Sequence, residues 1–130
     1  MDYVITPEDI TWKALDSPTA PGVGFSFTPS VIGADYTEQY SAQLGKVAPG
    51  GLSKPHVDPY GHAFYFISGT GTVTIGQQSW PLKPGTIVKI PSGPTHSFTN
   101  TGAEDLTFLV IYDPPHVSGG PFEDADAASA

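Results

Sequence analysis

Apolar and polar residues alternate over several short stretches between residues 23 and 112. Side chains two positions apart lie on the same face of a β-strand, so this alternation is typical of strands that bury one face. Most of the stretches are also rich in β-branched and aromatic residues, which favour strands. The pattern predicts strands at residues 23–28, 38–47, 62–68, 71–77, 86–90, 96–99 and 105–112.

Glycine and proline separate these stretches. The chain has 15 Gly and 14 Pro, and both residue types favour tight turns. We expect turns at Pro49-Gly50-Gly51, Gly69-Thr70-Gly71, Lys83-Pro84-Gly85, Ser92-Gly93-Pro94 and Asn100-Thr101-Gly102. No long stretch has the 3.6-residue period of a helix, although residues 6–9 suit one short helical turn. The fold class is therefore all-β, a sandwich or a barrel.

The two ends of the chain differ from its middle. Residues 1–22 are rich in Pro, Asp and Thr, and we expect them to form an N-terminal arm on the surface. Residues 114–130 are rich in Pro, Gly, Ser, Asp and Ala, a composition typical of a mobile, solvated acidic tail. A length of 130 residues suits a single domain, with its barrel at about residues 23–113.

The composition argues against several classes of partner. The chain has 13 acidic and 5 basic residues, a net charge of −8 and no arginine. A nucleic-acid partner requires a cationic face and is not expected, and the missing arginine disfavours phosphorylated substrates. The N-terminal sequence lacks the basic and apolar segments of a signal peptide, and no apolar run has the length of a membrane span. We expect a cytoplasmic protein with no membrane partner.

Residues 85–100 carry the most specific motif of the chain. They follow the pattern G-x5-P-x-G-x2-H-x3-N, with fixed positions at Gly85, Pro91, Gly93, His96 and Asn100. This pattern resembles the second conserved motif of the cupins, a family of jelly-roll β-barrels. The resemblance implies that fold for the chain, and it implies a metal ligand at the histidine.

The first cupin motif is present in an altered form. Its common form contains H-x-H-x3-E-x6-G, and His56 and Gly69 match the first and last of these positions. Asp58 stands in place of the second histidine, and His62 stands in place of the glutamate. The spacing resembles that of small single-domain bacterial cupins with four histidines. The resemblance implies one divalent transition metal per chain, held by His56, Asp58, His62 and His96.

Strand geometry supports the same site. His56 and Asp58 are two residues apart, so on a strand they point to one side, and His62 and His96 each open a further strand. Four ligands on three strands can thus converge inside a barrel. Asp58 has a second interpretation, because an Asp-Pro turn also uses the carboxylate to accept backbone hydrogen bonds. His116 matches no motif, and we expect it at the surface.

The absence of cysteine leaves His, Asp, Glu and amide groups as metal ligands. Three imidazoles and one carboxylate suit Fe, Mn, Co, Ni or Zn in the divalent state. Aromatic side chains beside the ligands are expected to wall a pocket, namely Phe64, Phe66, Phe98 and Phe108. Tyr40 and Tyr60 are predicted catalytic residues, because each carries a hydroxyl that can donate to a bound oxyanion.

The resemblance implies a metalloenzyme that acts on a small neutral, aromatic or polyketide-like molecule. Its chemistry would be that of a dioxygenase, or the Lewis-acid chemistry of a lyase, isomerase or cyclase. The alternative is a non-catalytic cupin that binds a small molecule and uses the metal for structure or for ligand orientation. Small cupins often pair through an edge strand, so we expect a homodimer, with the segment around Phe25 and Phe27 as a candidate edge.

Overall fold

The computed structural model describes residues 1–15 and 22–115, which form one 3-10 turn and nine strands. The elements are η1 (Pro7–Asp9), β1 (Lys13–Ala14), β2 (Gly22–Phe27), β3 (Ser41–Ser53), β4 (Gly61–Ser68), β5 (Gly71–Ile75), β6 (Gln78–Leu82), β7 (Ile87–Ile90), β8 (His96–Asn100) and β9 (Leu106–Asp113). The all-β class is therefore confirmed. No helix among the described residues is long and apolar enough to cross a bilayer.

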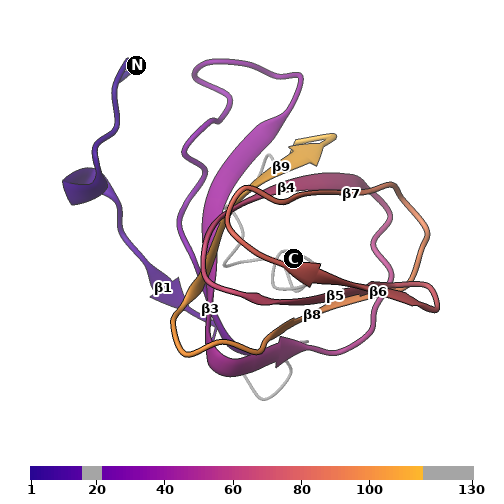
Figure 1. The fold of residues 1–130 in the computed structure, drawn as a ribbon. Helices are drawn as coiled ribbons and strands as arrows, with labels where there is room; N and C mark the ends of the chain where they lie inside the picture. The colour runs from indigo at the N-terminus through magenta and orange to yellow at the C-terminus, as the bar shows by residue number, and fades with distance from the viewer. Residues whose placement is uncertain (16–21, 116–130) are drawn as a thin grey trace.

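The strands form one antiparallel sheet that curls round a central core. Its order is β6-β5-β8-β3-β9-β4-β7, and β2 pairs with both β1 and β3. Figure 1 shows β4, β7 and β9 on one side of the enclosed space and β5, β6 and β8 on the other. The long strand β3 connects the two sides because it pairs with β9 near its start and with β8 near its end. This curled sheet has the jelly-roll form that the sequence motifs imply.

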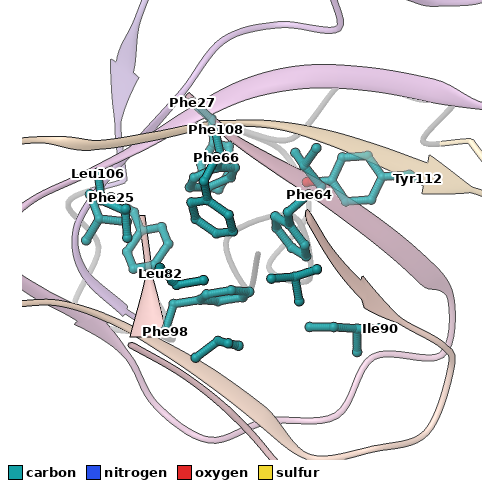
Figure 2. Packing of buried hydrophobic residues seen from close by; sticks show 14 residues of the cluster. Phe25, Phe27, Phe64, Phe66, Leu82, Ile90, Phe98, Leu106, Phe108 and Tyr112 are labelled. Atoms are coloured by element: carbon teal, nitrogen blue, oxygen red, sulfur yellow. The ribbon is translucent and has the colours of Figure 1, made fainter. Parts of the chain in front are cut away.

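The core consists of aromatic and aliphatic side chains that alternate with outward-facing residues along the strands. On β4 the buried residues are His62, Phe64 and Phe66, and on β8 they are His96, Phe98 and Asn100. Figure 2 shows the phenylalanine rings of β4 and β8 directed into the space between the strands. The period of two therefore places the histidines of both strands on the same inner surface as the core.

Most predicted strands agree with the structure, and the main differences lie at residues 49–51, at β6 and at the connection that carries His56 and Asp58. The turn expected at residues 49–51 is not a chain reversal, because β3 continues through it to Ser53. The backbone of Gly50 has a φ of +79°, a conformation that glycine adopts readily. The pairing register between β3 and the neighbouring β2 also shifts, between Val23 and Phe25. The bent strand can consequently change partners from β9 to β8.

The strand β6 was not predicted, because Pro81 lies within it. A proline has no backbone N–H to donate, but at the end of the sheet order β6 pairs only with β5 among the described strands. The pair is closed by the two residues Gly76 and Gln77, with a positive φ at the glycine. An edge strand of this kind tolerates the proline that argues against a central strand.

The N-terminal arm contains the expected helical turn, η1, and Lys13 and Ala14 pair with β2. Residues 1–9 are all exposed, and Figure 1 shows the arm running beside the barrel. The rings of Phe25 and Phe27, from the segment expected as a candidate dimer edge, lie in the core, with 2% and 0% exposure. The tail expected beyond residue 115, including His116, lies outside the described residues.

Candidate metal centre

The third difference concerns His56 and Asp58, which do not lie on a regular strand as expected. They lie in the connection between β3 and β4, where only His56 makes an isolated bridge, to His96. Pro55 and Pro59 stand in this connection, and neither can donate to a ladder. Alternation along a strand is therefore not what directs the two side chains inward. His56 is held by the bridge to the first residue of β8, and the Asp58 carbonyl accepts a hydrogen bond from the N–H of Gly93, just before that strand.

The four predicted ligands nevertheless come together. The Nε2 atoms of His56, His62 and His96 lie 3.4, 3.2 and 3.1 Å from one oxygen of Asp58, Oδ2. The pairing of β4 places His62 opposite Ile90 on β7 and opposite Tyr112 on β9. Residues from the β3–β4 connection, β4 and β8 thus meet at one point inside the curled sheet.

Three of the four side chains in the cluster are buried. The side chains of His62, His96 and Asp58 are 0%, 1% and 2% exposed, whereas the His56 side chain is 14% exposed. Solvent or a small molecule therefore reaches the cluster most directly past His56.

Backbone carbonyls orient two of the imidazoles. Nδ1 of His56 lies 2.7 Å from the Lys54 carbonyl oxygen, and Nδ1 of His96 lies 3.1 Å from the Pro94 carbonyl oxygen. A carbonyl oxygen only accepts, so each Nδ1 donates its hydrogen and each neutral ring carries its lone pair on Nε2. A metal-binding histidine usually donates such a hydrogen bond from the ring nitrogen that does not bind the metal.

The arrangement of the imidazole nitrogens round the Asp58 carboxylate is favourable only with a cation between them. Lone pairs on Nε2 of His56 and His96 face a carboxylate oxygen, and these contacts are repulsive unless a proton or a metal ion lies between them. Nε2 of His96 and both ring nitrogens of His62 are buried without a hydrogen-bond partner among the described residues. Burying such groups is costly unless they are bound. The donor set therefore fits a metal ion.

The distances agree with this interpretation. Ligand atoms about 2.0–2.2 Å from a metal lie about 3 to 3.5 Å apart when neighbouring in an octahedral or tetrahedral site. The ligand atoms of His56, Asp58 and His96 all lie within 4.8 Å of one another and form a candidate metal-binding triad. His62 is outside this triad and reaches it through Asp58 Oδ2. A set of two histidines and one carboxylate leaves positions open for other ligands.

Aromatic residues surround the cluster on its inner side. The Phe64 ring lies 4.9 Å from that of His62, and the Phe98 ring lies 6.4 Å from that of His96. Phe66 and Phe108 lie one layer deeper, with ring centroids 6.1 and 5.4 Å from that of Phe64. Of the four predicted pocket residues, Phe64 and Phe98 thus contact the histidines, whereas the other two support them from the core.

The two predicted catalytic tyrosines lie in different places. The Tyr60 ring packs edge-on to His62, with centroids 5.4 Å apart, and contacts Tyr112 in the same way at 5.7 Å. Tyr40 instead lines a separate cavity of about 790 Å³, together with residues of the N-terminal arm such as Tyr3 and Ile5. A hydrogen-bonding role is therefore compatible with the position of Tyr60, and the role of Tyr40 has no support from its surroundings.

Tyr112 lies beside the cluster, although the sequence analysis did not single it out as a site residue. It is opposite His62 in the β4–β9 register, and the two rings are stacked at 6.2 Å. Burial, with smaller contributions from Tyr60 and Asp58, raises the pKa of its hydroxyl well above the usual value. The hydroxyl therefore stays protonated. The alternation along β9 placed Tyr112 on the inner face, but only the register places it beside His62.

Comparisons with known proteins agree with this fold and site. Residues 43–112 match a family model described as a cupin domain. An uncharacterized protein of Streptomyces coelicolor, SCO3923, is 32% identical over 62 residues, which cover 48% of this chain and 56% of that protein. A glucose-6-phosphate isomerase from Thermococcus gammatolerans is 37% identical over 54 residues, or 38% of this chain and 29% of that enzyme. The chain thus spans about half or less of these curated relatives.

Solved structures extend the likeness over most of the chain. The polyketide cyclase RemF of Streptomyces resistomycificus has a TM-score of 0.73 at 18% identity, with 99% of both chains covered. A predicted oxalate decarboxylase of Thermotoga maritima has a TM-score of 0.73 at 24% identity, covering 85% of this chain and 98% of that one. Likenesses at these identities describe the fold alone. Together with the family match over more than half of its residues, they show that this chain belongs to the cupin family.

Proposed function

We propose that this cupin is a metal-dependent enzyme that acts on a small neutral, aromatic or polyketide-like molecule. The observation that carries the proposal is the convergence of three imidazole nitrogens, all within 3.4 Å of one buried carboxylate oxygen. A group of this kind is costly to bury without a cation. His56, Asp58 and His96 would hold the metal, with His62 as a further ligand.

A bound divalent metal would supply Lewis acidity towards an enol or carbonyl oxygen, or a means of activating dioxygen. Mn, Fe, Co, Ni and Zn all accept mixed imidazole and carboxylate ligands. The protein would orient the metal ligands, because the Lys54 and Pro94 carbonyls hold the rings of His56 and His96 with Nε2 directed to the centre.

The surroundings favour an uncharged substrate. The phenylalanine rings of β4 and β8 form the inner wall, and the chain has no arginine to pair with a carboxylate or phosphate. The substrate would approach past His56, the one partly exposed member of the cluster. A solved structure that shares this fold over the full chain is described as a polyketide cyclase, so polyketide-like molecules are included in the proposed substrate class.

In this proposal two tyrosines would assist the reaction. Tyr60, half-buried beside His62, would donate a hydrogen bond to a substrate oxygen at the entrance side of the cluster. Tyr112, whose hydroxyl remains protonated, would keep a donor available on the buried side. If Asp58 does not bind the metal directly, its oxygen would accept a proton from the substrate instead, at the same point of the site.

The experiment that tests the proposal begins with metal analysis of the purified chain. We expect about one transition metal per chain after loading with Fe(II) or Mn(II), and metal-dependent conversion of a diketone, phenol or polyketide-like substrate. Oxygen consumption coupled to conversion would assign the dioxygenase route. Conversion that proceeds equally well without oxygen would assign the lyase, isomerase or cyclase route. A chain that can be loaded with no transition metal would overturn the proposal.

A non-catalytic binding role is the second candidate. It is favoured by the near-complete burial of the His62, His96 and Asp58 side chains, which suits a metal with a structural role. In that case a small ligand would raise the thermal stability of the metal-loaded protein and be recovered unchanged after long incubation. Loss of the ligand with formation of a product would exclude it.

A further inference from the structure

Trp80 is a large aromatic side chain at the margin of the inner surface of the curled sheet. In the pairing of β5 with β6 it stands opposite Val73, which is 1% exposed and belongs to the core cluster. Leu82, two residues further along β6, is buried in the same core. The opposite face of the two strands carries Thr74 and Ser79, whose hydroxyl oxygens are 2.8 Å apart in an exposed hydrogen bond. Paired residues, and residues two apart, share a face of a sheet, so the indole of Trp80 is on the inner face.

The inner face continues from Trp80 to the candidate metal centre. His96 on β8 is opposite Ile75 on β5. In the next inner row Phe98 is opposite Val73, which is itself opposite Trp80. Trp80 is therefore two strands and one row away from His96. With strands about 4.8 Å apart and inner rows about 7 Å apart, the two Cα atoms are separated by about 12 Å, a distance that one small organic molecule can span.

Trp80 is 43% exposed, although the neighbouring inner residues Val73 and Phe98 are 1% and 2% exposed. A single apolar residue exposed on an outer surface needs no explanation, whereas an exposed indole on an inner face marks a place where that face can be reached from solvent. The sheet order explains why this place is at β6. The strands β6 and β7 are the two ends of the sheet, and they lie on opposite sides of the enclosed space without pairing with each other among the described strands (Figure 1). The inner surface is consequently accessible beside Trp80.

The margin formed by β5 and β6 is uncharged. Neither strand contains an acidic or basic residue. On the inner face, the residue beside Trp80 towards the metal centre is Gln78, an exposed amide opposite the half-buried Ile75. An indole has a broad π face that stacks on planar rings. A planar neutral molecule therefore suits this margin better than an anion, for which neither strand offers a cation.

We propose that the planar part of the substrate stacks on Trp80 while an oxygen of the same molecule binds at the metal centre. This inference rests on the proposed metal-dependent function, and it narrows the substrates to molecules with two or more fused rings. A single ring is too small to contact the indole and the metal at the same time. Trp80 thus determines specificity from a position away from the reacting atoms, and Gln78 provides a hydrogen-bonding amide beside the stacked rings.

The first test measures binding to the Zn(II)-loaded full chain by calorimetric titration. The probes are catechol, with one ring, and 1,8-dihydroxyanthraquinone, with three fused rings, and both carry neighbouring oxygens that can bind a metal. We expect Trp80→Ala to weaken binding of the three-ring probe by about tenfold, because stacking and apolar burial are lost, and to change the affinity for catechol by less than about twofold. Trp12→Ala is the matched control, because Trp12 is the only other tryptophan and its ring instead packs against Lys46, with Nζ 4.2 Å from the ring centroid. It should bind both probes as the wild type does.

The two proposals fail separately in this experiment. Equal affinity of the wild type and Trp80→Ala for the three-ring probe would overturn the stacking role, and so would a metal-loaded wild type that binds catechol but not the three-ring probe. Neither result would affect the metal centre. A three-ring probe that binds equally well with and without Zn(II), and more weakly to Trp80→Ala, would support stacking but contradict the role of the metal in the proposed function.

The second test separates stacking from a structural role of the side chain. Trp80→Phe keeps a π face and should bind the three-ring probe within about threefold of the wild type, whereas Trp80→Leu is apolar without a π face and should bind it as weakly as Trp80→Ala. Metal content and the midpoint of thermal unfolding should be similar in all three variants, because the side chain is partly exposed. A Trp80→Leu variant that binds the three-ring probe as tightly as Trp80→Phe would contradict stacking.

Discussion

His56 and His96 are joined by both their backbones and their rings. The N–H of His56 donates to the carbonyl of His96 at 3.1 Å, and the N–H of His96 donates back at 2.9 Å. Their ring centroids are 4.3 Å apart. This isolated bridge fastens an irregular connection to the start of β8, and it places two ligand nitrogens on one carboxylate oxygen without any regular strand at His56.

The imidazole of His96 should be required for metal binding. We expect His96→Ala to retain less than about a tenth of the wild-type metal, because the ring supplies one member of the triad. Elemental analysis of the dialysed protein measures this content. His116→Ala is the matched control, since that histidine belongs to no motif, and it should bind metal normally. Equal metal content in the two variants would show that the metal is bound elsewhere.

Asp58→Asn distinguishes a ligand from a turn-forming residue. Asparagine has nearly the same shape but no charge, so it lowers the affinity for a divalent cation while preserving a side-chain acceptor. We expect the metal affinity to fall by at least about tenfold, a typical effect for groups that bind or orient a metal ligand. Competition with a coloured chelator measures the affinity. An unchanged affinity would leave Asp58 only its turn role.

Metal retention should depend on pH through the imidazoles. A histidine must be neutral to bind a metal, and an unperturbed histidine has a pKa of about 6.5. We expect both the metal content and the midpoint of thermal unfolding to fall together below about pH 6. Metal content that stays constant down to pH 5 would contradict ligation by three histidines.

Tyr112 should make stability fall at alkaline pH. Its pKa is raised in the folded protein, mainly by burial, so above about pH 10 the unfolded chain releases a proton that the folded chain retains. The unfolded state is then favoured, by up to about 1.4 kcal/mol per pH unit. Denaturant unfolding of metal-free protein at pH 8 and pH 11 should show this loss. The loss should be smaller in Tyr112→Phe and unchanged in Tyr65→Phe, which alters an outward-facing ring.

Gly45 should be required for packing of the core. A Cβ at this position would lie 2.5 Å from the Phe108 ring and 2.8 Å from the Phe27 ring, both of which are buried. We expect Gly45→Ala to lower the free energy of unfolding by about 1–3 kcal/mol, the usual cost of overpacking. Gly33→Ala, where the nearest atom is 3.6 Å away, serves as the control and should change it little. Equal stabilities would mean that the rings move aside freely.

Regular strands were predictable because their pattern is local. The alternation of His62, Phe64 and Phe66 placed these residues on one buried face, and β4 has this face in the structure. The same holds for His96 and Phe98 on β8. The errors occurred where partners decide the conformation. At Gly50 the strand β3 continues because β9 pairs with its first half and β8 with its second half. At Pro81 an edge position tolerates a residue that is unfavourable in a central strand.

The sequence by itself determined the all-β class, the cupin motifs and the identity of the four side chains that meet at the candidate metal centre, because these depend on residue type and spacing. Only the tertiary structure decided how they meet. His56 and Asp58 reach the centre from an irregular connection fastened to β8, Tyr112 joins them through the β4–β9 register, and Tyr40 faces a different cavity. Register and long-range pairing depend on the chemistry of distant partners, which no local pattern records.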